Sequence, residues 1–161
     1  MKYLIVLLAV IGAVVGQTCK YSKDNINSNW RMVNGGIQIN YQNKRIMNNQ
    51  WTAIGFGQSM QDLSVVVFMV QNNQVTVRTG RTNGYGPPQF DNQNNVQVQS
   101  SMFSGNNLNA MVTVPLNSNG KNLQQCMTWN FVGTGPLNNG QLGVHSARPN
   151  QLQNVCASQC R

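Results

Sequence analysis

Two short apolar runs lie close together near the middle of the chain, separated by a polar hinge. They cover Trp51–Phe56 and Leu63–Val70 and are rich in Val, Ile and aromatic residues. Gly55 and Gly57 mark the end of the first run. A helix would have to accommodate both glycines and a β-branched run, each of which is unfavourable in helices. The pattern therefore predicts two buried β-strands.

Several further segments have the alternation of apolar and polar residues that is typical of half-buried strands. Ile37–Tyr41 and Val75–Arg78 alternate with a period of two. Asn34-Gly35-Gly36 and Asn72-Asn73 are typical of the tight turns that join hairpin strands. The remaining predicted strands are Trp30–Val33, Val96–Phe103, Leu108–Leu116 and Met127–Val132.

Two long connections separate these strands. The first, Gly80–Asn95, contains the Pro87-Pro88 pair, which excludes a central strand there, and the second, Gly133–Gly143, is rich in glycine. No segment shows sustained helical periodicity. Seven or more short strands with turns at regular spacing predict an all-β protein, an antiparallel immunoglobulin-like β-sandwich.

The first sixteen residues have the pattern of a secretory signal peptide. Met1-Lys2 is basic, Tyr3–Val15 is apolar, and small residues lead up to Gly16. This apolar run is too short to cross a bilayer well. We therefore expect cleavage after residue 16, a secreted, extracellular product without a membrane span, and a single β-sandwich domain over residues 17–161 with a cysteine-containing tail.

Four cysteines fit an oxidising compartment. Cys19, Cys126, Cys156 and Cys160 form an even set, which predicts two disulfides with three alternative pairings. Cys19 and the Cys156/Cys160 pair lie at opposite ends of the chain, so a bridge between the two ends is expected. No Cys-x-x-Cys spacing indicates a zinc site.

The charge balance is basic but sparse. The chain has 11 Lys and Arg against 3 acidic residues, a net charge of +8, and only 9% charged residues. The basic residues are scattered and carry no aromatic-basic motif, so we expect a solvated basic surface and no nucleic-acid partner. Attraction to acidic glycans or anionic partners is the alternative.

The inventory of reactive side chains argues against several enzyme classes. Three aspartates far apart in sequence and no glutamate disfavour a paired-carboxylate glycosidase. One histidine cannot supply a multi-histidine zinc site, and no nucleophile elbow or phosphate-binding glycine motif occurs. We therefore expect that the chain is not itself an enzyme.

The central stretch resembles a known family. W-x-x-I-G-F-G-x-x-M-x-D-L, from Trp51 to Leu63, followed by a Val-rich strand, is similar to the core motif of the DOMON domain family. That family includes the cytochrome domain of cellobiose dehydrogenase and plant auxin-induced b-type cytochromes. The resemblance extends from about Trp30 to about Pro149 and implies the same β-sandwich that the strand pattern predicts.

The resemblance also implies a cofactor, haem b. In DOMON cytochromes the axial iron ligands are a methionine just after the Trp-containing strand and a histidine near the end of the domain. Here these are Met60 and His145, the latter being the only histidine. Imidazole and thioether fill both axial positions, favour ferrous iron and suit electron transfer. No Cys-x-x-Cys-His occurs, so the haem would be held without covalent attachment.

Other residues around this site carry weaker expectations. Arg148 is the arginine nearest to His145 in sequence and is a candidate partner for a haem propionate. Met69 is an alternative methionine ligand, although its place on a strand predicts that it faces the core. The loop containing Tyr85 and Pro87-Pro88 is expected to wall a pocket by analogy. Trp30, Trp51 and Trp129 are interpreted as core residues.

Two functions remain open at this point. The first is a secreted b-type cytochrome that passes single electrons between separate extracellular redox partners. The second is a haem-free DOMON module that binds a sugar, a small hydrophobic ligand or an extracellular protein. The sequence names neither the partners nor the ligand.

Overall fold

The computed structural model describes residues 18–161, which form β-strands joined by turns and end in one short 3₁₀ helix. The predicted signal peptide lies outside these residues. The strands are β1 (Lys20–Lys23), β2 (Ile26–Val33), β3 (Gly36–Asn43), β4 (Gln50–Phe56), β5 (Ser64–Gln71), β6 (Gln74–Arg81), β7 (Gln89–Phe90), β8 (Gln97–Ser104), β9 (Asn107–Pro115), β10 (Asn117–Ser118), β11 (Lys121–Asn122), β12 (Met127–Asn138), β13 (Gln141–Leu142) and β14 (Asn150–Val155), and the 3₁₀ helix η1 is Ala157–Gln159.

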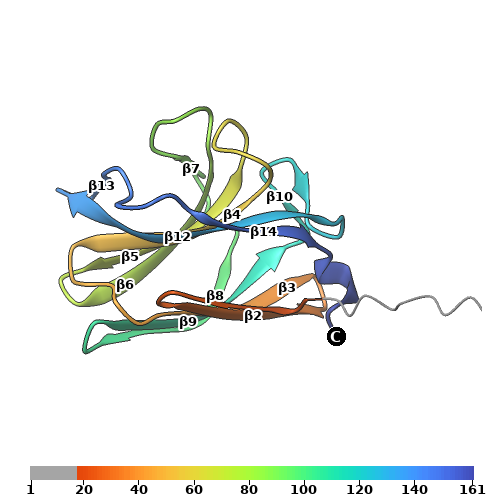
Figure 1. The fold of residues 1–161 in the computed structure, drawn as a ribbon, viewed down its shortest axis with the longest axis horizontal. Coiled ribbons are helices and arrows are strands. Elements are labelled where there is room, and N and C mark those ends of the chain that lie inside the picture. The colour runs from red at the N-terminus through yellow and green to blue at the C-terminus, as the bar shows by residue number, and fades with distance from the viewer. Residues whose placement is uncertain (1–17) are drawn as a thin grey trace, which may run out of the picture.

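Most strands form two antiparallel sheets that lie one over the other (Figure 1), and β10 and β11 form a separate two-stranded hairpin. The first sheet has the order β1-β2-β3-β9-β8. The second has the order β13-β12-β4-β5-β6-β7, and β14 also pairs with β12. Each predicted strand overlaps one of these elements and extends at most one residue beyond it, and the predicted β-sandwich is confirmed.

The predicted hairpin turns are present with the backbone conformation that their sequences require. Asn72 and Asn73 between β5 and β6 have φ angles of 51° and 59°, and Gly35 between β2 and β3 has a φ of 84°. Asparagine and glycine tolerate this left-handed region better than other residues do. The turns therefore fix the register of both hairpins.

The main core lies between the sheets and is aromatic. Trp30 of β2 packs on Trp129 of β12 with ring centroids 4.5 Å apart. Tyr41 of β3 stacks on Phe68 of β5 at 4.6 Å. The assignment of Trp30 and Trp129 to the core is therefore confirmed, and the two contacts join the layers.

The largest difference between a predicted and an observed strand boundary is at the end of β12. The strand expected to end at Val132 continues as β12 to Asn138, through a segment predicted to be a loop. A register shift between Val132 and Gly135 lets β12 continue its pairing with β4 beyond the glycines. Glycine is common at such irregularities.

Two disulfides close the fold, as the cysteine count predicts. Cys19 pairs with Cys160, with their Cα atoms 5.6 Å apart, and this bridge joins the two ends of the described chain. Cys126 pairs with Cys156. The expected bridge between the ends is confirmed, and the structure selects one pairing of the three.

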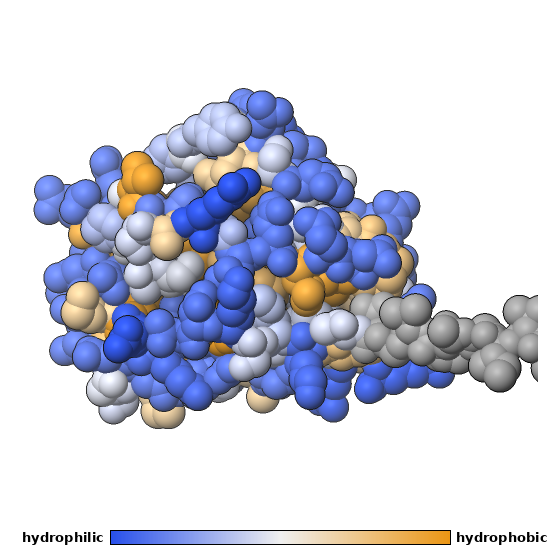
Figure 2. Space-filling model, viewed as in Figure 1, coloured by the Kyte–Doolittle hydropathy of each residue, from blue (hydrophilic) through white to orange (hydrophobic). Residues whose placement is uncertain are grey.

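The visible surface is mainly hydrophilic, and hydrophobic residues appear there only in small separate areas (Figure 2). Asn, Gln, Ser and Thr account for most of this polarity, since only 9% of the residues are charged. Between residues 18 and 161 there is no helix long and apolar enough to cross a membrane.

Candidate functional site

The second sheet is apolar on both faces. In β4 every residue from Trp51 to Phe56 is buried, and in β5 every residue from Ser64 to Val70 is buried. An antiparallel sheet commonly has one face in water and alternates accordingly. The continuous apolar runs of β4 and β5 therefore indicate that other parts of the chain cover the outer face of the second sheet as well.

Alternate residues of β4 and β5 divide between the two faces. Phe56 and Phe68 face the main core, whereas Trp51 and Val67 face the outer side. Trp51 and Met69 are buried, as predicted for core residues, but both belong to a second, outer cluster and do not face the main core. The outer cluster consists of Trp51, Ala53, Leu63, Val65, Val67, Met69, Val132, Leu137 and Leu142, with Met60 and Phe90 packed against it.

Loops cover this outer cluster. The loops that follow β4 and β6 rise on the outer side of the second sheet (Figure 1). Between them and the segment after β13 is a pocket of about 80 Å³. Its lining is Trp51, Met60, Tyr85, Gly86, Pro87, Pro88, Leu142, Gly143, Val144 and His145.

The structure brings Met60 and His145 into the same pocket, although 84 residues separate them in the chain. Both also line an adjoining pocket of about 30 Å³ that reaches down to the sheet. The expected wall is present as well, because Tyr85, Pro87 and Pro88 line the first pocket. Met69 lines neither pocket.

The imidazole of His145 is held in one orientation. Its Nδ1 lies 2.7 Å from the carbonyl oxygen of Ala147. A carbonyl oxygen only accepts, so Nδ1 carries the proton and donates it. In the neutral ring this leaves the lone pair on Nε2, the arrangement found in metal-binding histidines.

Trp51 supports the segment that carries His145. Its indole Nε1 donates a hydrogen bond of 3.0 Å to the carbonyl oxygen of Gly143. The indole also meets the imidazole edge-on, with ring centroids 6.3 Å apart. Trp51 is thus both a wall of the pocket and a support for the histidine.

Gly135 allows the indole to lie against the backbone of β12. A Cβ atom placed on Gly135 would be 2.4 Å from Trp51 Nε1, closer than real Cβ contacts allow. The absence of a Cβ atom at Gly135 therefore leaves the space that the Trp51 indole occupies.

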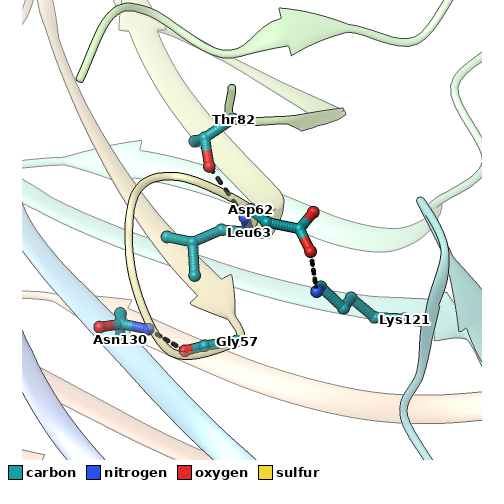
Figure 3. A network of polar contacts seen from close by, with 6 residues as sticks. All are labelled: Gly57, Asp62, Leu63, Thr82, Lys121 and Asn130. Carbon is teal, nitrogen blue, oxygen red and sulfur yellow. Dashed lines mark hydrogen bonds and ion pairs between the residues drawn. The ribbon is translucent and has the colours of Figure 1, made fainter. Parts of the chain in front are cut away.

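The loop that carries Met60 is fixed at both ends (Figure 3). Asn130 Nδ2 donates a 2.8 Å hydrogen bond to the carbonyl oxygen of Gly57. The backbone N–H of Leu63 donates to Thr82 Oγ1 at 2.8 Å. Asn130 and Thr82 also line the inner pocket, so the polar groups there are paired with backbone.

An ion pair holds the outer side of the same loop. Lys121 Nζ donates to a carboxylate oxygen of Asp62, as Figure 3 shows. This hydrogen bond and the charge of Lys121 lower the pKa of Asp62 below its ordinary value. The carboxylate is exposed, and its role is to keep the loop close to the β10–β11 hairpin.

The structure does not bring Arg148 to this pocket. Arg148 is exposed and lines a separate groove together with Asp24, Arg45 and Asn150. Arg78 lies over the ring of Phe90, 4.1 Å from its centroid, at the margin of the outer cluster. Within the described residues, neither of the two pockets that Met60 and His145 share has a lysine or arginine in its lining.

Nothing between residues 18 and 161 gathers three or more His, Cys, Asp or Glu side chains into a metal-binding group. The donor pair in the pocket is a thioether and an imidazole. Sequence reasoning missed Trp51 and Asn130 as site residues. The continuous apolar run of β5 was the available signal, because it shows that the outer face of the sheet is covered.

Comparison with known proteins places the chain in a family. A profile of the DOMON domain matches residues 22–135. The chain belongs to the DOMON domain family. It is 40% identical to a DOMON domain-containing protein of Caenorhabditis briggsae, over 99% of this chain and 98% of the relative. It is 38% identical to one of Caenorhabditis elegans, over 95% and 97%.

Solved structures share the fold of this DOMON protein. The cytochrome domain of Myriococcum thermophilum cellobiose dehydrogenase superposes with a TM-score of 0.60 at 10% identity, over 83% of this chain and 77% of that one. The cytochrome b domain of pyranose dehydrogenase from Coprinopsis cinerea gives a TM-score of 0.59 at 12% identity, with the same coverage. At such low identity the likeness concerns the fold alone.

Proposed function

We propose that this DOMON protein is secreted and binds haem b in the pocket between Met60 and His145, acting as a one-electron carrier. The observation that carries the proposal is the convergence of these two side chains on one apolar pocket. The only histidine of the chain supplies a ring nitrogen oriented for a metal, and the thioether lies on a loop anchored at both ends.

The Met60 thioether and the His145 imidazole suit a haem iron. The pocket between them, however, is too small for haem unless part of its wall moves. A pocket of about 80 Å³ is smaller than the roughly 300–1,000 Å³ typical of ligand sites. Haem therefore enters only if the Tyr85–Pro88 loop swings outward. Two backbone bonds tie the β6–β7 loop to the Met60 loop: the Thr82 N–H donates to the Leu63 carbonyl oxygen at 2.9 Å, and the Gly84 N–H donates to the Met60 carbonyl oxygen at 3.2 Å. In this proposal the Gly84 bond, which is nearer to the Tyr85–Pro88 segment, breaks when haem enters.

The roles of the residues follow from their positions. His145 Nε2 and the Met60 sulfur would hold the iron, and the outer cluster, with Trp51, would exclude water from the ring. Bound haem would supply a single redox centre that cycles between ferric and ferrous iron. Because His145 and Met60 would both hold the iron, the bound haem would serve electron transfer rather than oxygen binding.

Two features support secretion. The sequence of residues 1–16 has the basic, apolar and small-residue order of a signal peptide. All four cysteines are paired in disulfides, which persist in oxidising compartments. In this proposal the electron donor and the electron acceptor are separate extracellular redox proteins.

A haem titration tests the proposal. The purified protein should take up one equivalent of haem and show a sharp Soret band with narrow α and β bands after reduction. Met60→Ala and His145→Ala should each abolish the six-coordinate spectrum. Met47→Ala is the matched control, because Met47 is 53% exposed and lies outside both pockets. If the wild-type protein takes up no haem, the proposal is wrong.

The size of the pocket favours a second candidate function. A cavity of about 80 Å³ walled by Trp51, Tyr85 and two prolines fits a small apolar ligand without any loop movement. Under this alternative the protein is a haem-free binding module. It predicts quenching of Trp51 fluorescence by a small apolar ligand in protein that takes up no haem.

A further inference from the structure

The first sheet has two edges of different character. β1 forms one edge and carries Lys20 and Lys23. β8 forms the other edge, and in the described part of the chain it pairs only with β9. Its sequence, Gln97–Ser104, contains neither a charged residue nor a proline.

Edge strands are usually protected against pairing with another chain by lysine, proline or short length. The edges of the second sheet have these protections. β7 and β13 each have two residues, β6 carries Arg78 and Arg81, and β14 follows Arg148-Pro149. β8 has eight residues and lacks all three. Its pairing with β9 has one irregularity, between Val98 and Ser100, and is regular from Ser100 to Ser104.

The side chains of β8 are also exposed. Seven of its eight residues are exposed, and Phe103 is half-buried. Among residues 18–161, five large hydrophobic side chains are exposed, and two of them are on β8: Val98 at 43% and Met102 at 61%. An unprotected edge with exposed apolar side chains is the combination expected of a surface that pairs with another strand.

We propose that β8 pairs antiparallel with β8 of a second copy of this chain, so that the two five-stranded sheets join into one. Self-pairing is favoured because the edge has no charge. Two copies with a net charge of +8 repel each other over most of their surface, but they can approach here without placing like charges opposite each other. This surface lies on the other sheet from the Met60 pocket and does not depend on haem.

The strand can pair with itself in a register centred on Met102. Met102 and Ser100 pair with Asn109 and Met111 of β9 on the outer face of the sheet, whereas Phe103 pairs with the buried Leu108 on the core face. An antiparallel pairing centred on Met102 places Met102 opposite its own copy. It also places Ser100 opposite Ser104 and Ser101 opposite Phe103. Each pair then shares a face of the sheet, as pairing requires.

Sedimentation of the purified protein over a range of concentrations tests the association. We expect a monomer–dimer equilibrium in the wild type. Met102→Lys places two like charges opposite each other at the centre and should weaken the dimer by at least about tenfold. Ser22→Lys is the matched control, because it adds the same charge to an exposed site on the opposite edge strand and should leave the dimer intact.

Cysteine cross-linking tests the register and does not require the lysine variant to fold. Directly opposed residues of antiparallel strands have Cα atoms about 4.5–5.5 Å apart, within disulfide range. Met102→Cys should therefore form a covalent dimer on mild oxidation, whereas Ser104→Cys on the same face should not. A wild type that remains monomeric at high concentration, a dimer insensitive to Met102→Lys, or cross-linking at Ser104→Cys in place of Met102→Cys would each overturn the proposal.

Discussion

Trp51 Nε1 donates a 3.0 Å hydrogen bond to the carbonyl oxygen of Gly143, two residues before His145. The two residues lie 92 positions apart in the chain. This bond connects a strand of the second sheet to the segment that carries the histidine. The shape of the candidate site therefore depends on the indole as much as on the histidine itself.

Trp51→Phe should affect the site more than the fold. The substitution keeps an aromatic ring on the outer cluster but removes the hydrogen bond to Gly143, so we expect a loss of about 1 kcal/mol in the free energy of unfolding. Haem affinity should fall as the His145 segment loosens. Urea unfolding and haem titration measure the two effects.

Trp30→Phe is the control for this prediction. Trp30 is buried in the main core, far from the pocket lining, and its indole N–H has no hydrogen-bond partner. It should lower stability through lost packing and leave haem affinity unchanged. Equal haem affinity in wild type and Trp51→Phe would show that the indole does not position the histidine.

Two nearby glycines of β12 should respond differently to alanine. In Gly135→Ala the new Cβ would lie 2.4 Å from Trp51 Nε1, so the indole or the strand must shift. We expect a loss of about 1–3 kcal/mol in the free energy of unfolding. Gly133→Ala meets no atom within 4 Å and should be close to neutral. The urea unfolding midpoints of the two variants test this prediction, and we expect the lower midpoint for Gly135→Ala. Equal midpoints would contradict the packing argument.

The ion pair between Asp62 and Lys121 should give a pH dependence on the acid side. Lys121 lowers the pKa of Asp62, so the stability that this contact adds is present above the ordinary carboxyl pKa of about 3.9 and is lost as the pH falls through the lower folded-state pKa. Lys121→Met should raise the pKa of Asp62, as measured by NMR titration of its carboxyl group. Lys44→Met, a change at another exposed lysine, should leave that pKa where it is.

Tyr41 should give a pH dependence on the alkaline side. Burial is the main cause that raises its pKa above the ordinary value of 10, and its hydroxyl is paired with Thr52 Oγ1 at 2.5 Å. A raised pKa means that the stabilisation is complete below pH 10 and is lost as the pH rises further. Each such group contributes a slope of up to about 1.4 kcal/mol per pH unit.

Tyr41→Phe isolates this contribution. The variant should be less stable than the wild type at neutral pH by about 1 kcal/mol, because the hydrogen bond to Thr52 is lost. Above pH 10 its stability should fall less steeply with pH. Burial and the charge of Asp24 raise the pKa of Tyr21 to about 12, so some alkaline slope remains in both proteins. Parallel stability curves of wild type and variant above pH 10 would contradict the assignment.

The strands with clear patterns could be predicted from local sequence. Ile37–Tyr41 alternates because one face of β3 meets the core, and Asn72-Asn73 adopts positive φ angles because asparagine tolerates them. β1 and β14 escaped prediction because their sequences, KYSK and NQLQNV, are short and polar. These two strands form at the sheet margins, through pairing with β2 and β12.

The sequence by itself determined the sandwich class, the hairpins, the even cysteine set and the family motif. Each of these follows from local residue patterns or from a count of residues, and none requires knowing which distant residues meet. Only the tertiary structure decided that Trp51 faces outward, that Arg148 lies in another groove and that Met60 meets His145. Those facts depend on which face of a sheet each residue occupies and on how distant loops close over it. Strand pairing between residues far apart in the chain sets both.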